Sequence, residues 1–145
     1  MFLVDTNILI YAADNSSDAH PKYKELLNQW RCEPTPWYLT WGIIYEFLRV
    51  TTHPRVFRNP WNIKQAWEFI EVLLQSDSLR VLTEGQKHRE HLSQIIENPR
   101  ELRGNILQDA QIAAVMREHG IQIIYTRNTD FHKFPHLKVK DPLLL

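Results

Sequence analysis

Four acidic residues could supply the chemistry of this chain: Asp5, Glu46, Asp109 and Asp130. Two of them follow apolar runs that have the character of strands, and two lie in apolar stretches that have the character of helices. Mg²⁺ and Mn²⁺ prefer oxygen ligands, and a cluster of carboxylates suits them. A divalent cation held by such a cluster lowers the pKa of water and polarises a phosphoryl oxygen. The set therefore predicts metal-dependent hydrolysis of a phosphodiester.

Asp109 is the most informative of the four because its helical neighbours are apolar. At spacings of three, four and seven residues lie Ile106, Ile112, Ala113 and Met116. A buried carboxylate without a partner costs several kcal/mol, so Asp109 on this face needs a hydrogen-bond donor or a cation. An N-cap is the alternative explanation if the helix begins one residue after Asp109.

The other three acids also have structural explanations. Asp5 could cap the helix that follows it. Glu46 lies in the apolar stretch 43–48, but Arg49 at i+3 could pair with it as an ordinary helix ion pair. Asp130 could be a turn residue. Each acid is ambiguous alone, and the prediction of a metal site rests on all four together.

Three neutral polar residues are candidates to support the acids. Asn7 follows the first apolar run, and Thr126 and Asn128 follow the last long one. In an open parallel sheet, ligands bind beyond the carboxyl ends of the strands. Thr126 and Asn128 could therefore position water or the scissile phosphate, although a turn at a strand end explains both equally well.

Strands and helices alternate along the chain. The pattern predicts strands over residues 2–4, 37–40, 79–83 and 121–126, with an edge strand over 137–140. It predicts helices starting near Ile8, from Ser17 or Asp18 to about Arg31, over 41–52, around 66–74, over 85–97 closed by Asn98-Pro99, and from Gly104 to Gly120. This alternation indicates an α/β fold with a mainly parallel sheet of four to five strands and helices on both faces, in one domain over residues 1–145.

Composition narrows the function classes. Seventeen basic and 17 acidic residues give a formal net charge of zero, so the chain is not a strongly basic nucleic-acid binder. The four glycines form neither a Gly-x-Gly pattern nor a P-loop, which leaves nucleotide-cofactor binding unsupported. Cys32 is the only cysteine, and we expect a buried thiol and a reducing, cytoplasmic setting. No stretch approaches the ~18 apolar residues of a membrane span.

Four segments together resemble a known family, the PIN-domain ribonuclease toxins of the VapC type. The segments are residues 2–12 (FLVDTNILIYA), 41–52 (WGIIYEFLRVTT), 104–114 (GNILQDAQIAA) and 126–135 (TRNTDFHKFP), followed by Asp141-Pro142-Leu143. Asp-Thr-Asn alone is common. Four such segments in order, at the family's spacing, are specific, and they cover almost the whole chain.

The resemblance implies a PIN-like three-layer α/β/α fold and a divalent-metal-dependent endoribonuclease using Mg²⁺ or Mn²⁺. It further implies the toxin role of a toxin–antitoxin pair, a homodimer, and a small VapB-like antitoxin that blocks the acidic site. Asp5, Glu46, Asp109 and Asp130 match the family's acidic positions, as primary ligands (Asp5, Asp109) or supporting ones. Many relatives carry an aspartate where this chain has Asn128. The fourth position therefore falls to Asn128 or Asp130.

Two other functions compete with the nuclease. A catalytically inert PIN-fold module that binds RNA or a protein would keep the fold without turnover, and the asparagine at position 128 leaves that open. A phosphatase with Asp5 as nucleophile would commonly carry a second carboxylate two residues later. That position is Asn7, which counts against phosphatase chemistry.

Overall fold

A five-stranded, fully parallel sheet runs through the middle of the molecule in the order β3-β2-β1-β4-β5. It is seen in a computed structural model that describes residues 1–97 and 102–144. The strands are β1 (Phe2–Val4), β2 (Trp37–Thr40), β3 (Leu79–Leu82), β4 (Ile123–Tyr125) and β5 (Lys138–Lys140). The α/β prediction with a parallel central sheet is confirmed.

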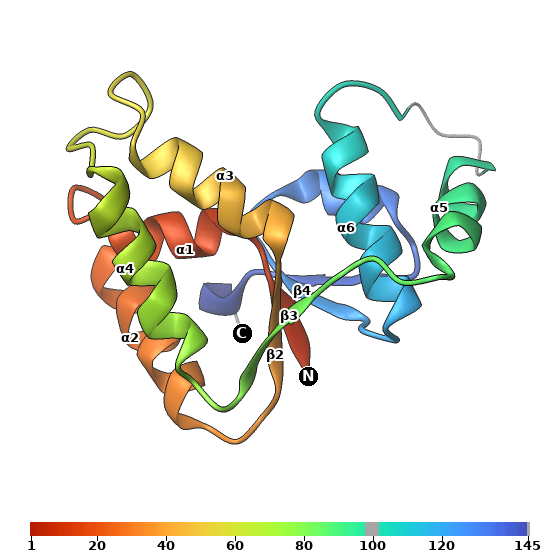
Figure 1. Cartoon of the computed structure of the whole chain (residues 1–145), viewed down its shortest axis with the longest axis horizontal. Coiled ribbons are helices and arrows are strands. Elements are labelled where there is room, and N and C mark those ends of the chain that lie inside the picture. The colour runs from red at the N-terminus through yellow and green to blue at the C-terminus, as the bar shows by residue number, and fades with distance from the viewer. Residues whose placement is uncertain (98–101, 145) are drawn as a thin grey trace.

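Six α-helices in the described residues flank the sheet as two groups (Figure 1). They are α1 (Thr6–Ala13), α2 (His20–Cys32), α3 (Trp41–Thr51), α4 (Ile63–Leu74), α5 (His88–Glu97) and α6 (Ile106–Glu118), with 3₁₀ turns η1 (Thr129–Lys133) and η2 (Pro142–Leu144). After β3 the strand order reverses direction. Because parallel crossovers are right-handed, the helices before β3 and those after it cover opposite faces. Helices α1 to α4 lie together, away from α5 and α6.

The apolar runs form strands because both of their faces are buried. All three residues of β1 are buried, as expected for a central parallel strand covered by helices on each side. Helix α3 starts directly after β2, where the Thr40 hydroxyl accepts a hydrogen bond from the Ile43 amide at 3.2 Å. Burial of Ile43 and Phe47 on one face of α3 turns its opposite face outward. That outward face carries Glu46 and lines the candidate site.

Several predicted elements are one to three residues longer or shorter than observed; α6, for example, covers Ile106–Glu118 instead of 104–120, and β4 ends at Tyr125 instead of 126. Two of the differences have identifiable reasons. Helix α1 begins at Thr6 rather than Ile8 because Asp5 caps it. Strand β4 begins at Ile123 rather than residue 121, because the Ile121 amide donates to the Met116 carbonyl at 2.9 Å and closes α6. Gly120, with φ of 71°, makes this closure possible, as its predicted C-terminal position suggested.

The predicted starts of two further helices need correction. Helix α2 begins at His20 without a side-chain cap from Ser17 or Asp18. Helix α5 begins at His88, because the amides of Gly85 and Lys87 donate to a glutamate of α6 instead of starting a helix.

Cys32 is exposed rather than buried, because it lies at the last position of α2. The predicted closure of α5 by Asn98-Pro99 lies outside the described residues. Among the described residues, no helix has the length and apolar character needed to span a membrane.

Candidate active site

The site lies where the sheet's crossovers diverge. Strands β1 and β4 are adjacent, with Leu3 opposite Ile124 and Val4 opposite Tyr125. The chain leaves β1 toward β2 on one side and enters β4 from the opposite face, which opens a crevice at their carboxyl ends. Asp5 and Thr126 are the first residues beyond these two strands. The adjacency of β1 and β4 therefore explains why Asp5, near the start of the chain, lies beside Thr126, near its end.

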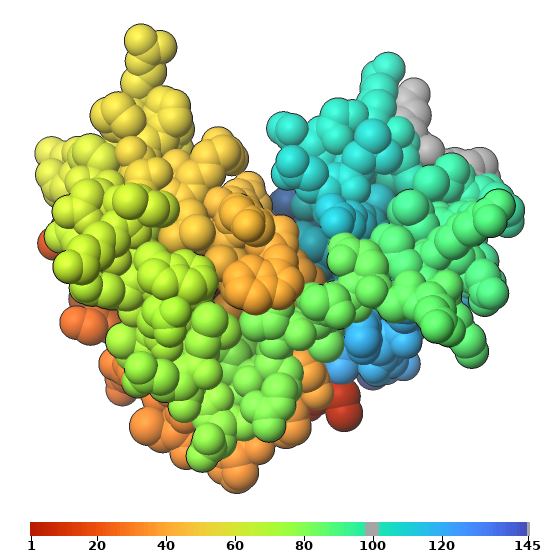
Figure 2. Space-filling view, in the orientation of Figure 1, coloured from red at the N-terminus to blue at the C-terminus, as the bar shows by residue number. Residues whose placement is uncertain are grey.

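A cleft of about 610 Å³ opens at this point and holds most of the predicted site. Its lining includes Asp5, Asn7, Glu46, Asp109, Asn128 and Asp130. Figure 2 shows a hollow on the molecular surface between the regions of α3 and α6. Only Thr126 of the seven predicted residues is absent from the lining, because its side chain is buried at 2% exposure. Four acids separated by up to 125 positions in sequence thus share one cleft.

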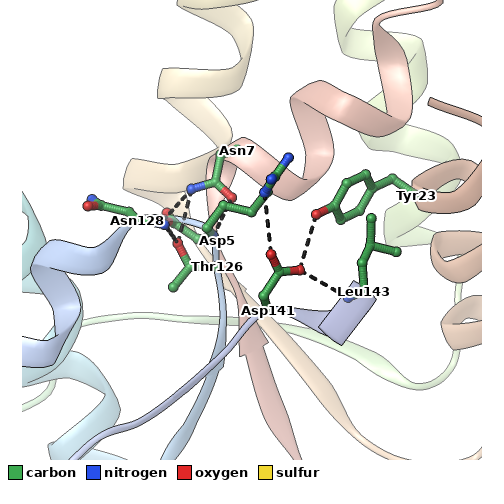
Figure 3. Close-up of polar contacts among 8 residues, drawn as sticks. Asp5, Asn7, Tyr23, Thr126, Asn128, Asp141 and Leu143 are labelled. Atoms are coloured by element: carbon green, nitrogen blue, oxygen red, sulfur yellow. Dashed lines mark hydrogen bonds and ion pairs between the residues drawn. The ribbon is translucent and has the colours of Figure 1, made fainter. Parts of the chain in front are cut away.

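Asp5 is held on both carboxylate oxygens (Figure 3). Its Oδ1 accepts from the Thr6 amide at 2.8 Å, and its Oδ2 accepts from the Thr126 hydroxyl at 2.7 Å and the Asn7 side-chain amide at 3.2 Å. Burial raises the pKa of Asp5 above its usual value, the hydrogen bonds from Thr126 and Thr6 oppose the rise, and the charge of Glu46 adds to it. Asp5 is therefore both the cap of α1 and a strained anion facing the cleft.

Thr126 connects Asp5 to its neighbours instead of facing the cleft. Its hydroxyl donates to Asp5 and accepts from the Asn7 side chain at 3.0 Å and from the Asn128 amide at 2.9 Å. The structure thus places Thr126 behind Asp5, out of reach of a phosphate. Asn7 completes the arrangement, because its Oδ1 accepts from the Arg127 amide at 3.2 Å.

Asp109 lies inside the first turn of α6, which begins at Ile106, so the N-cap explanation does not hold. The Asn128 side-chain amide donates to its Oδ2 at 3.3 Å. Burial first, then the charges of Asp5 and Asp130, raise the pKa of Asp109 to about 7, and the Asn128 hydrogen bond opposes the rise. A cation bound beside Asp109 would favour its ionised form and lower this pKa.

Glu46 combines a site position with the ion pair expected for it. Its Oε2 accepts from the Thr6 hydroxyl at 3.0 Å, and its Oε1 lies 3.8 Å from an Arg49 nitrogen. The side chain is 40% exposed, so the arginine contact is weak in water. The hydrogen bond from Thr6 holds Glu46 at the edge of the cleft, close to the start of α1.

Asn128 and Asp130 play different parts in the loop after β4. Both polar atoms of the Asn128 side chain are engaged: Nδ2 donates to Asp109, and Oδ1 accepts from the Asp130 backbone amide at 3.0 Å. Asn128 is thereby the N-cap of the turn η1. The carboxylate of Asp130 lies near enough to raise the pKa of Asp109.

A second polar network, not anticipated from the sequence, supports this loop (Figure 3). Asp141 accepts from the Tyr23 hydroxyl at 3.3 Å and lies 3.4 Å from the Arg127 guanidinium, which also lies over the Tyr11 ring. Arg127 is the residue whose amide holds Asn7. The motif Asp141-Pro142-Leu143 was the only signal of this network in the sequence.

The donor set of the cleft fits a hard divalent cation. Its acidic side chains are all carboxylates, and burial, with a smaller contribution from neighbouring negative charges, raises the pKa values of Asp5 and Asp109. Within residues 1–97 and 102–144, however, no three Asp, Glu, His or Cys side chains already form a set that could hold a metal ion. The acids share a cleft without forming a finished cage.

Comparison with known proteins agrees with this architecture. The model of the PIN domain family matches residues 2–137. The chain is 32% identical to Ribonuclease VapC48 of Mycobacterium tuberculosis over 138 residues, which is 95% of this chain and 94% of that protein. The match therefore extends over nearly the full length of both proteins.

Solved structures show the same fold at lower identity. VapC20 of Mycobacterium tuberculosis, a sarcin-ricin loop cleaving toxin, has a TM-score of 0.64 and 22% identity, covering 91% of this chain and 93% of that one. VapBC2 from Rickettsia felis, bound to a DNA fragment from its promoter, has a TM-score of 0.65 and 18% identity over 96% of each chain. Sequence, fold and family model agree, and the chain belongs to the PIN domain family, among the VapC-type ribonucleases.

Proposed function

We propose that this chain is a metal-dependent endoribonuclease, the toxin of a toxin–antitoxin pair. The observation that carries the proposal is that Asp5, Glu46, Asp109 and Asp130 line one cleft, where burial and the charges of its neighbours raise the pKa of Asp109. The ribonuclease activity of its relatives provides the substrate class. The reaction is hydrolysis of an RNA phosphodiester, with Mg²⁺ or Mn²⁺ as cofactor.

In this proposal Asp5 and Asp109 are the primary metal ligands, and Glu46 and Asp130 complete the set or orient water. Asp130 takes the fourth acidic position because it carries a charge, unlike Asn128, and lies near enough to raise the pKa of Asp109. The bound cation supplies Lewis acidity, which polarises the phosphoryl oxygen and lowers the pKa of water. The chain itself holds Asp5 through Thr126 and Asn7, so that little reorganisation is needed on binding.

The test is cleavage of RNA by the purified chain with Mg²⁺ or Mn²⁺, with and without a chelator. We expect cleavage that stops on chelation and returns when the cation is restored. Activity that survives chelation contradicts the proposal. Binding of RNA without turnover under the same conditions favours the catalytically inert module instead.

The biological setting is also a proposal. A cognate VapB-like antitoxin and a homodimer are what VapC-type relatives lead us to expect, in the cytoplasm and with residues 1–145 as one domain. Co-expression with the product of a short neighbouring reading frame is the check. Growth arrest by the chain alone, relieved by that product, supports the toxin role, whereas arrest that the product leaves unchanged contradicts it.

Thr126→Val should weaken divalent-cation binding by about tenfold or more, because outer-shell partners of ligands contribute about that much to metal affinity. Valine keeps the shape of threonine but removes the hydroxyl that holds Asp5. Isothermal titration with Mn²⁺ measures the effect, and Thr35→Val, in an exposed loop remote from the cleft, is the control. Equal dissociation constants for the two variants would show that Thr126 does not position Asp5.

A further inference from the structure

A second groove of about 400 Å³ lies between α3 and α6 and continues the acidic cleft. We call it the α3–α6 groove. Four residues line both cavities: Glu46, Arg49, Gln108 and Ile112. Of these four, only Glu46 has a role in the reaction proposed above. The shared lining places the groove directly beside the cleft.

One wall of the α3–α6 groove carries two aromatic rings that the fold does not need. Trp41 and Tyr45 are 43% and 70% exposed and lie on one face of α3 at i and i+4. Gly42 lies between them in sequence and adds no side chain to this wall. Exposed rings of this kind can stack on a planar ligand.

The opposite wall, along α6, combines two glutamine amides with the apolar side chains of Ile112 and Val115 and carries no charge. Gln108 and Gln111 lie at i and i+3, and the Gln111 amide donates to Glu84 at 2.8 Å. Primary amides donate and accept hydrogen bonds, which matches the edge of a nucleobase. The charges in the groove are two carboxylates, Glu46 and Glu84, and the guanidinium of Arg49. The excess of negative charge disfavours a phosphate group in the groove, whereas an uncharged base is not repelled.

We propose that the α3–α6 groove is a base-binding subsite for an unpaired RNA nucleotide next to the scissile phosphate, an inference that rests on the proposed nuclease function. Trp41 and Tyr45 stack on the base, and Gln108 and Gln111 face its edge. Single-stranded RNA is recognised through such stacking and edge contacts. The volume also lies within the ~300–1,000 Å³ of small-molecule sites. The groove therefore requires single-stranded substrate and selects the nucleotide beside the cut.

The test compares Trp41→Ala and Tyr45→Ala with Trp67→Ala, which removes an exposed tryptophan of α4 outside both cavities. Substrates are a single-stranded RNA oligonucleotide and its abasic analogue, lacking the base beside the mapped cut. We expect Trp41→Ala to raise KM on normal RNA by about fivefold to a hundredfold. For the unaltered chain, KM should be higher on the abasic analogue than on normal RNA by a similar factor. For Trp41→Ala, KM should differ much less between the two substrates, because the stacking contact is already lost.

Binding measurements separate failure of the subsite from failure of the nuclease. Fluorescence anisotropy gives the affinity of the Asp109→Asn chain for the same oligonucleotide, with and without Trp41→Ala. Loss of affinity with Trp41→Ala supports the subsite even if the unaltered chain cuts no RNA. If the unaltered chain cleaves RNA, and Trp41→Ala and Tyr45→Ala have the same KM, RNA affinity and cut position as Trp67→Ala, the subsite is overturned but the nuclease is not. Absence of RNA binding overturns both.

Sedimentation of the same variants decides between RNA and a second protein chain. If Trp41→Ala lowers the mass of the particle in solution while RNA affinity stays unchanged, the groove is an interface between copies and the base-binding proposal is overturned. An unchanged mass together with lost RNA affinity supports it.

Discussion

Asp5→Asn and Asp109→Asn should each lower RNA cleavage by at least about a hundredfold, the scale on which electrostatic groups of an active site contribute. Asparagine keeps the size of aspartate but not the charge that binds a cation. Cleavage of an RNA oligonucleotide at fixed Mg²⁺ measures the loss. Asp109→Asn should fold at least as well as the unaltered chain without metal, because it removes a charge that the cleft disfavours. Asp5→Asn should be less stable, because its amide has one acceptor oxygen where Asp5 accepts from three donors.

The combination of lost activity and retained stability in Asp109→Asn distinguishes a catalytic role from a structural one. Asp77→Asn is the control, since Asp77 is exposed at the opposite end of the sheet, just before β3. It should leave both cleavage and unfolding unchanged. If Asp109→Asn cuts RNA as fast as Asp77→Asn does, the acidic cleft is not the active site.

Without divalent cations, the chain should become less stable as pH rises from about 4 to about 7. The folded-state pKa of Asp109 is about 7, against 3.8 for the free residue. Over this interval the unfolded chain releases the proton while the folded chain keeps it, so the free energy of unfolding falls. Because Asp109 is only half-buried, we expect the loss to be about 1–2 kcal/mol. Mg²⁺ at pH 8 should restore the lost stability by binding to the ionised carboxylates of the cleft.

Urea unfolding at pH 5 and pH 8, compared between the unaltered chain and Asp109→Asn, isolates this contribution. The comparison is needed because burial lowers the pKa of His136, and that group makes stability rise with pH. The difference between the two chains removes His136 and every other shared group. A pH dependence that is the same in both chains contradicts the assignment to Asp109.

The sequence was sufficient to predict the strands, the parallel sheet and the acids of the cleft. Apolar runs such as residues 2–4 are buried on both faces, and this signal is local. Asp109 was visible because a carboxylate on an apolar helical face is costly wherever the helix packs. The ends of the elements were harder to predict than their existence. Ile121 is not part of β4 because its amide closes α6, and this depends on how the helix and the strand are packed.

The supporting contacts of the site could not be read from the sequence. Thr126 appeared to be a residue that could face substrate, yet it is buried behind Asp5. The link from Asp141 through Arg127 to Asn7 joins residues from both ends of the chain. Such contacts depend on side-chain geometry in three dimensions, and no spacing along the chain encodes them.

The central place of β1 has a consequence for the synthesis of this protein. Its partner β4 lies late in the chain, and 121 positions separate Asp5 from the threonine that holds it. Chains emerge from the ribosome at about 5–20 residues per second, and pairings of such high sequence separation form last. A nascent chain therefore cannot complete the hydrogen bonds around Asp5 until β4 and Thr126 have emerged.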